Sequence, residues 1–234
     1  PKVLFADEPT ASLDHENAFR VMHYLKEYAK EHLVIVITHD HSILEGADRV
    51  IEIWDGESAQ EPDKDSEGNY IIKLPSELAW LADQVNGVTR AAANTFKGET
   101  FKLTKDIDLN NERWTPIGAT GKFLGTFDGQ NHKVTNLFVS ETDKTPVGLF
   151  SNARNIKNVK VIGAEIYGHY KAGVIVGDGL CAKIDNCHVE DAIVKIVPLN
   201  EDDANHAGGI VGYLSGEPVA YVKNSSVKNA EIFA

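Results

Sequence analysis

The first 57 residues combine short apolar runs with one amphipathic segment. The expected strand at 2–6 contains a continuous apolar run at 3–6, and a second such run lies at 33–37. Runs of this kind are typical of strands that are covered on both faces of a parallel sheet. Residues 16–30 between them place apolar side chains at helical spacing. A short helix at 42–45 and a strand at 49–54 are expected to follow, ending at an Asp-Gly turn. This order predicts an α/β segment whose parallel strands end at one edge, where ligands commonly bind.

The pattern changes after residue 57. Residues 58–69 are acidic, contain Pro and Gly and have almost no apolar side chains, which predicts a linker. A new unit is expected over 70–234. It opens with a strand at 70–72 and a helix that Pro75-Ser76-Glu77 begins and that runs to about residue 86. Beyond about residue 95 the chain consists of short strand patterns, turns, Gly and Asn.

A repeat runs through the second unit. Its copies are VTNLFV (134–139), IKNVKV (156–161), IDNCHV (184–189) and VKNSSV (222–227). The shared asparagines are Asn136, Asn158, Asn186 and Asn224, at spacings of 22, 28 and 38 residues. A second motif precedes three of the copies: VGLF (147–150), AGVIVG (172–177) and AGGIVG (207–212). Constant strands with loops of variable length predict stacked coils, a β-solenoid in which the asparagines form a ladder. An antiparallel sandwich is the alternative.

The same half resembles a known family. The segments that carry the resemblance are YIIKLPSELAWLADQVN (70–86), FKLTKDIDL (101–109), WTPIG (114–118), FLGTFDGQNHKVTNL (123–137) and VGLF (147–150). They are similar to the GLUG-motif proteins, which are mostly cell-surface and secreted proteins of bacteria. The resemblance covers about 70–234. It implies a right-handed parallel β-helix with an N-terminal capping helix, and a role in adhesion through a carbohydrate or protein ligand. It supplies no catalytic residues.

Some parallel β-helices cleave polysaccharides, which requires clustered carboxylates on an outer face. The candidates here are Asp106, Asp108, Asp128, Asp202 and Asp203. Turn chemistry accounts for the same residues, because Asp-Gly at 128–129 is a favoured turn pair. The histidines share no spacing and are expected to be surface residues: His132, His188 and His206. Non-catalytic binding through loops such as 195–206 is therefore the favoured interpretation.

Candidate chemistry in the first segment lies where its strands end. Asp7 and Glu8 follow the first apolar run, and Thr38, His39 and Asp40 follow the second. Two carboxylates at a strand end are costly as structure, but one can hold a metal ion while the other takes a proton.

VLFADE, PTASLD and ITHD resemble the Walker B, D-loop and H-loop motifs of the ATP-binding domain of ABC transporters, of the lipoprotein-releasing and cell-division exporter type. ADRVIEIWDGE (47–57) is similar to the strand pair that closes the same domain. The resemblance covers about 1–57. It implies that Asp7 holds Mg²⁺, Glu8 polarises the attacking water, His39 contacts the γ-phosphate and Asp14 acts across the dimer interface. Mg-ATP would then be the cofactor, and a membrane permease the partner.

Two motifs of such a domain are absent. No GxxxxGK[ST] loop and no LSGGQ-type signature occurs in the 234 residues, so nothing cradles the phosphates. We therefore expect no ATP binding or turnover by this chain alone. Two function classes remain: a surface binding module joined to an inactive ATPase remnant, or a fragment of an ABC ATP-binding subunit. They imply different locations, the cell surface for the solenoid and the cytoplasmic side of the membrane for the ATPase.

The composition of the chain narrows the classes of partner that are expected. The formal net charge of −12 argues against nucleic acid and anionic membranes. No apolar window reaches the length of a membrane span, and no signal-peptide pattern is present. Cys181 and Cys187 make neither a disulfide framework nor a zinc motif.

Overall fold

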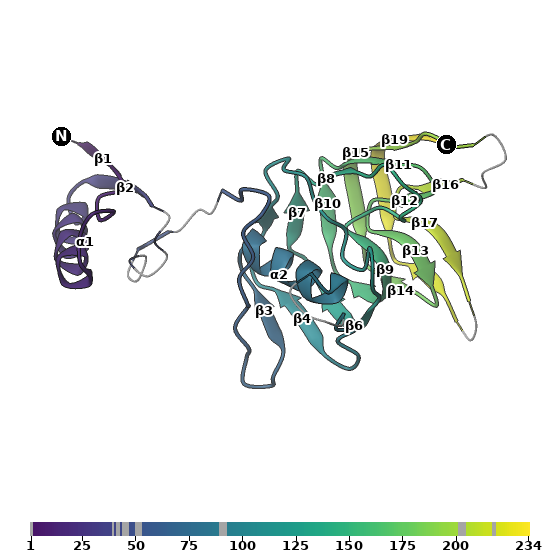
Figure 1. Ribbon diagram of the computed structural model, residues 1–234, viewed down its shortest axis with the longest axis horizontal. Coiled ribbons are helices and arrows are strands. Elements are labelled where there is room, and N and C mark those ends of the chain that lie inside the picture. The colour runs from purple at the N-terminus through teal and green to yellow at the C-terminus, as the bar shows by residue number, and fades with distance from the viewer. Residues whose placement is uncertain are drawn as a thin grey trace. The chain divides into compact units, whose positions relative to one another are not determined.

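The computed structural model describes residues 2–38, 40, 43, 47–49, 53–88, 93–200, 205–216 and 219–234. The chain divides into two compact units, Pro1–Ile51 and Glu52–Ala234 (Figure 1). Over the described ranges it is mostly β, and it has two α-helices. Neither of these helices is both long and apolar enough to cross a membrane.

The first unit contains a parallel strand pair and a connecting helix. β1 (Val3–Asp7) pairs with β2 (Leu33–Ile37), from Val3 opposite Leu33 to Asp7 opposite Ile37. α1 (His15–Ala29) joins them and contacts β2. Of the predicted helix at 42–45 only residue 43 is described, and residues 50–52 of the predicted strand at 49–54 lie outside the described residues.

The strands of the first unit are not buried on both faces, contrary to the sequence-based expectation. Phe5 is 69% exposed and Ile37 56% exposed, on one face of the pair. The physical reason is the small size of the unit, since two strands and one helix do not supply a second covering layer. Burying one such side chain is worth about 1.5–3 kcal/mol. The apolar pattern of these strands therefore fits a larger sheet than the one formed by the described residues.

The second unit begins with β3 and α2 and continues as short strands (Figure 1). Its elements are β3 (Tyr70–Ile72), α2 (Pro75–Asn86), β4 (Thr100–Leu103), β5 (Ile107–Asp108), β6 (Phe123–Asp128), β7 (Lys133–Thr135), β8 (Phe138–Ser140), β9 (Phe150–Lys157), β10 (Lys160–Ile162), β11 (Glu165–Gly168), β12 (Lys171–Gly173), β13 (Val176–Leu180), β14 (Lys183–Asp185), β15 (His188–Ile196), β16 (His206–Gly208), β17 (Val211–Ser215), β18 (Tyr221–Lys223) and β19 (Ser226–Phe233).

These strands form parallel stacks. One stack runs β3–β4–β6–β9 and continues through β13 to β17, with β14 and β18 beside it. A second runs β5–β7–β10–β15, and β8–β11–β15 lies alongside, with β19 on the outer edge of β15. All pairings between these strands are parallel, which excludes the antiparallel sandwich over the described ranges.

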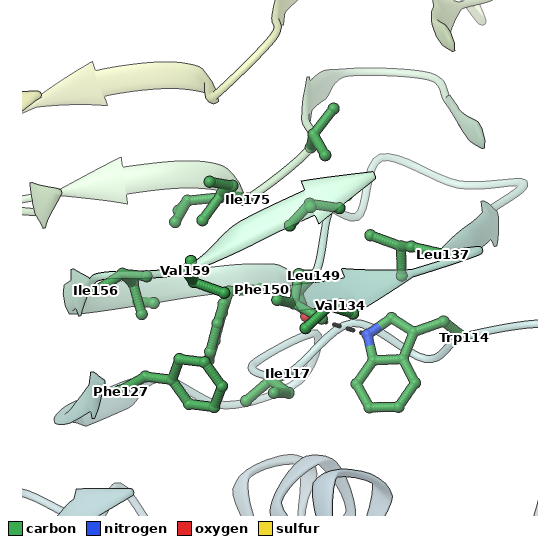
Figure 2. Packing of buried hydrophobic residues seen from close by; sticks show 14 of the residues in the cluster. Trp114, Ile117, Phe127, Val134, Leu137, Leu149, Phe150, Ile156, Val159 and Ile175 are labelled. Carbon is green, nitrogen blue, oxygen red and sulfur yellow. Dashed lines mark hydrogen bonds between the residues drawn. The ribbon is translucent and has the colours of Figure 1, made fainter. Parts of the chain in front are cut away.

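Inward-facing side chains form columns through the stacks. Val134, Val161, Val189 and Val227 share one level, and Val139, Ile166, Val194 and Ile232 share another. Figure 2 shows the packed core beside these columns, where the Trp114 indole nitrogen donates to the Leu149 carbonyl oxygen at 3.0 Å. From β7 and β8 up to β15 these columns bury branched aliphatic side chains, so burial fixes the register of these strands.

The structure corrects one part of the repeat alignment. Val134 pairs with Val161, so Asn136 lies level with Gly163 and not with Asn158. Asn158 instead follows Lys157, which pairs with Asp128, and its carbonyl oxygen accepts from the Asn131 amide at 2.8 Å. The motifs VTN and IKN look alike, but register follows the inward-facing residues.

Asparagines turn the chain between strands. Asn158, Asn186 and Asn224 have φ values of 54°, 52° and 51°, in the left-handed region that Asn tolerates better than most residues. The Asn186 side-chain amide donates to the Asn158 side-chain oxygen at 2.9 Å. The other two donate to aspartates at the ends of the neighbouring strands β6 and β14, at 2.9 Å each. The ladder is therefore a mixture of Asn–Asn and Asn–Asp steps.

α2 lies at the β3 end of the stack and has well-formed ends. The Glu77 carboxylate accepts hydrogen bonds from the backbone amides of Lys73 and Leu74, at 2.5 and 3.0 Å. The helix ends at Gly87, whose φ of 73° suits glycine. Its buried side chains include Leu78, Leu81, Ala82 and Val85.

The segment expected to be a linker lies in the second unit. The Gln60 amide donates to the Ser76 carbonyl oxygen at 3.0 Å, and the Ile71 amide donates to that of Asp63 at 2.8 Å. Trp54, expected in the last strand of the first segment, is 3% exposed and packs against Trp114 with ring centroids 5.5 Å apart. The acidic composition of this segment reflects its exposed side chains, whereas its backbone is hydrogen-bonded to β3 and α2.

Candidate functional site

The two adjacent acids lie where β1 ends. Asp7 is the last residue of β1 and is exposed. Glu8 turns the chain with a φ of 42°, a left-handed value that is uncommon for this residue type. Its amide continues the strand pairing by donating to the Ile37 carbonyl oxygen at 2.8 Å. The Thr38 hydroxyl, at the end of β2, donates to the Glu8 carboxylate at 3.3 Å. The Glu8 carboxylate and the Thr38 hydroxyl therefore meet at the edge of the pair where β1 ends at Asp7.

Asp14 has a local structural role. One of its carboxylate oxygens accepts from the Asn17 backbone amide at 2.9 Å, and the other accepts from the Asn17 side chain at 2.9 Å. This is an N-cap, which satisfies an amide that the first turn of α1 leaves without a partner. His39 lies outside the described residues. Of the polar residues at the strand ends, the structure brings Glu8 and Thr38 into contact, with Asp7 beside Glu8 in the chain.

The chemistry of these donors fits part of a magnesium-nucleotide site. Carboxylate and hydroxyl oxygens are the hard ligands that Mg²⁺ prefers, and Mg²⁺ usually takes only one or two carboxylates with substrate phosphates and water. Across the described ranges no three His, Cys, Asp or Glu side chains gather closely enough to hold a metal ion. A magnesium site at the end of β1 would therefore need further ligands beside a carboxylate, such as the phosphates of a nucleotide and water.

The carboxylates of the second unit anchor turns. Asp108 accepts from the Asn136 side-chain amide at 2.8 Å. Asp128 accepts from the Asn158 side chain at 2.9 Å and pairs with the Lys157 ammonium at 3.0 Å. Asp202 and Asp203 lie outside the described residues.

The lowered pKa of Asp128 argues against a role for this carboxyl group as a general acid. Burial by itself would raise this pKa, but the hydrogen bonds from Asn158 and Lys157 outweigh burial and lower it. Asp106 behaves alike, since the Lys133 backbone amide and the His132 ring offset its burial and lower its pKa. A glycoside hydrolase needs one carboxyl group with a raised pKa to protonate the leaving oxygen. The pKa values of Asp106 and Asp128 are shifted in the opposite direction.

The histidines of this unit also have structural contacts. His188 interacts through Nδ1 with the Ser226 hydroxyl at 2.8 Å and through Nε2 with the Asn186 side-chain oxygen at 3.1 Å. His206 packs against the Tyr213 ring, with centroids 4.8 Å apart.

A charged and aromatic cluster was not expected from the sequence. Lys171, only 8% exposed, pairs with Asp178 at 2.6 Å and lies over the Tyr213 ring at 4.1 Å. Burial would lower the pKa of Lys171, but the ion pair with Asp178 outweighs burial and raises it, so this lysine stays charged. The cluster comes from β12, β13 and β17, so spacing within one motif could not reveal it. The small cavity that Asp178 lines has about 30 Å³, room for about one water molecule.

Comparisons with known proteins find a local similarity over part of the chain. Over 58 residues the chain is 50% identical to the protein named "Putative hemin import ATP-binding protein HrtA" of Staphylococcus aureus strains Newman and USA300. The match covers 24% of this chain and 26% of those proteins, so the chain spans about a quarter of the length of the curated relatives it matches. No family model matches the chain. No solved structure matches it either. The chain thus carries a segment similar to an ABC-type ATP-binding protein.

Proposed function

We propose that the first unit is the part of an ABC-type ATP-binding domain that supplies the magnesium ligand and the catalytic carboxylate. The observation that supports this most is the contact between Glu8 and Thr38 at the end of a parallel strand pair whose first strand ends at Asp7. The 58-residue match to an ATP-binding protein points the same way.

Each residue has a distinct role in this proposal. Asp7 holds Mg²⁺ through its water shell, and Glu8 orients and polarises the water that attacks the γ-phosphate. His39 contacts the γ-phosphate, and Asp14 acts across a dimer interface. Mg²⁺ supplies charge neutralisation on the phosphates, which phosphoryl transfer needs more than a covalent group. In a complete transporter the domain would act on a membrane permease.

We propose further that the chain does not hydrolyse ATP by itself. A phosphate-binding loop with its lysine is absent from the 234 residues, so the β- and γ-phosphates have no cradle. The exposed apolar face of β1 and β2 fits a unit that needs more of the sheet around it. Activity is therefore expected only when the phosphate-binding portion is supplied.

For the second unit we propose a non-catalytic binding module built as a right-handed β-solenoid of the GLUG type. The parallel stacks, the aligned columns and the asparagine corners support the solenoid. The turn roles of Asp106, Asp108 and Asp128 favour binding over catalysis. The proposed ligand is a carbohydrate or a protein.

Mg-ATP binding tests the ATPase proposal. Residues 1–57 would replace the corresponding C-terminal segment of the similar ATP-binding protein, and thermal unfolding would be followed with and without Mg-ATP. At 100 times its Kd a ligand adds about 2.7 kcal/mol. We expect this stabilisation in the completed domain, and none in the 234-residue chain.

The variant Asp7→Asn should weaken the Mg²⁺-dependent part of the stabilisation. Glu16→Gln is the matched control, because Glu16 is an exposed residue of α1 that pairs only locally, with Arg20 at 2.6 Å. Equal stabilisation of the Asp7→Asn and Glu16→Gln domains would overturn the assignment of Asp7. Saturable stabilisation of the unmodified chain would overturn its proposed inactivity.

A further inference from the structure

A small hollow lies on the outward face of three neighbouring strands, β6, β9 and β13. These strands lie inside the stack, with β4 on one side of them and β17 on the other (Figure 1). Phe123 of β6 pairs with Ala153 of β9, and both side chains are buried. Residues on either side of this pair in the chain point outward. The outward residues that line the hollow are Lys122, Leu124, Asn152, Arg154, Asp178 and Leu180.

A bulge in β6 accompanies the hollow. Phe123 pairs with Ala153, whereas Thr126 pairs with Asn155, so β6 has one residue more than β9 over this stretch. Bulges re-aim side chains and are over-represented beside functional sites. The hollow has a volume of about 30 Å³, which admits one small group of a ligand and not a whole molecule.

Two cationic side chains flank the hollow. Lys122 and Arg154 are exposed, and neither forms an ion pair with another residue that the structure describes. Two lysines further along the same outward face, Lys157 and Lys223, pair with aspartates at 3.0 and 3.1 Å. In a chain of net charge −12, two cations left for a ligand favour an anionic group. The Arg154 guanidinium has the fork geometry that matches a carboxylate.

The Asp178 carboxylate in the hollow does not cancel this positive charge. It pairs with the Lys171 ammonium at 2.6 Å, and Lys171 is only 8% exposed. This pair is neutral as a whole, so the charges of Lys122 and Arg154 remain for the ligand. An ionised carboxylate has four lone-pair sites, so Asp178 can also accept a hydrogen bond from a ligand hydroxyl.

We propose that this hollow binds the carboxylate of a sugar acid, a uronic acid residue of an acidic polysaccharide. Arg154 and Lys122 hold the carboxylate, and Asp178 accepts from a nearby hydroxyl of the same sugar. Leu180, which is 46% exposed, packs against the C–H groups of the ring.

This set of groups distinguishes a sugar acid from other ligands. A neutral sugar lacks the anion, and the glutamate side chain of a peptide lacks the neighbouring hydroxyl. The inference rests on the binding function proposed for the second unit and narrows its ligand to one class.

Isothermal titration of the full 234-residue chain tests the ligand class. The probes are the trimers of galacturonic, glucuronic and mannuronic acid, each compared with the trimer of its neutral parent sugar and with a triglutamate peptide. We expect saturable binding of at least one acid trimer, with the neutral trimer and the peptide at least about tenfold weaker. No binding of any acid trimer, equal binding of the neutral trimer, or equal binding of the peptide would overturn the proposal.

Two exposed positions give a matched pair of variants for the site itself. Arg154→Gln should raise the dissociation constant of the acid trimer roughly tenfold or more, because a charge-assisted hydrogen bond is lost. Lys195→Gln is the control, since Lys195 is an exposed lysine of β15 in the other stack, and it should leave the constant unchanged. Circular dichroism checks that both variants are folded.

The variants also separate this inference from the function on which it rests. Equal dissociation constants for Arg154→Gln and Lys195→Gln would overturn the site. Neutral-sugar binding that Arg154→Gln leaves unchanged would overturn the site and keep the binding-module proposal, which fails only if the second unit binds no carbohydrate and no protein.

Discussion

Trp54 is the residue that most sharply defines where the second unit begins. It is 3% exposed, its ring lies 5.5 Å from that of Trp114, and its indole N–H donates to the Ser58 carbonyl oxygen at 3.0 Å. The side-chain amide of Asn110 donates to the Trp54 carbonyl oxygen at 3.3 Å. The structure therefore places Trp54 in the core of the second unit.

The variant Trp54→Ala tests this placement. Burying a Trp side chain removes roughly 200 Å² from water, worth about 5 kcal/mol at 25 cal/mol/Å². Measured large-to-small core substitutions of Trp or Phe cost about 3–5 kcal/mol. We expect Trp54→Ala to lower the free energy of unfolding of the second unit by about 3–5 kcal/mol. The neighbouring Ile53 is 76% exposed, so Ile53→Ala should change it by less than about 0.5 kcal/mol.

Urea unfolding followed by tryptophan fluorescence measures this difference. All three tryptophans of the chain, Trp54, Trp80 and Trp114, lie in the second unit, so the signal reports on that unit. Trp80 and Trp114 remain as probes in the variant. Equal stability of the Trp54→Ala and Ile53→Ala chains would refute the argument, because Trp54 would then lie outside the core.

Two further predictions concern the stack. Asn186 has a φ of 52°, so Asn186→Ala should lower the free energy of unfolding in urea by about 1–2 kcal/mol more than Asn186→Gly. Both variants lose the hydrogen bond to Asn158, but Gly adopts a left-handed φ without strain. Equal losses of unfolding free energy in the two variants would refute the assignment of Asn186 to a corner. Burial raises the pKa of the Cys187 thiol to about 11, so it should react slowly with thiol reagents at pH 8 until urea unfolds the chain. The unfolded thiol titrates first, near its ordinary pKa of 9.0, so the free energy of unfolding should fall as the pH rises from about 9 toward 11, and Cys187→Ala should remove that slope. If the free energy of unfolding of Cys187→Ala falls with pH as steeply as that of the unmodified chain, the pH dependence arises from other groups.

The local patterns of the sequence predicted the helices and strands better than they predicted which residues lie level with one another in the stack. β2 and the start of α2 at Pro75 agree with the apolar runs and helix signals. The register of Asn136 was wrong, because a six-residue motif does not say which valine faces inward. The structure resolves this through pairing of Val134 with Val161.

Long-range packing was not visible in the sequence. Trp54 follows an apolar strand pattern, yet its partner Trp114 lies 60 residues away in the chain. The pairing of Lys171 with Asp178 and Tyr213 likewise depends on how three strands stack. The acids at the end of β1, in contrast, could be recognised from adjacent residues alone.

Hydrolysis by the completed domain tests the central claim most directly. ATP turnover would be measured for the domain that carries residues 1–57, with Glu8→Gln compared with Glu16→Gln. If Glu8 polarises the attacking water, Glu8→Gln should lower the turnover rate about 100-fold or more, while Glu16→Gln keeps it. Equal turnover by the two variants would contradict the claim that the end of β1 is half of an ATPase site.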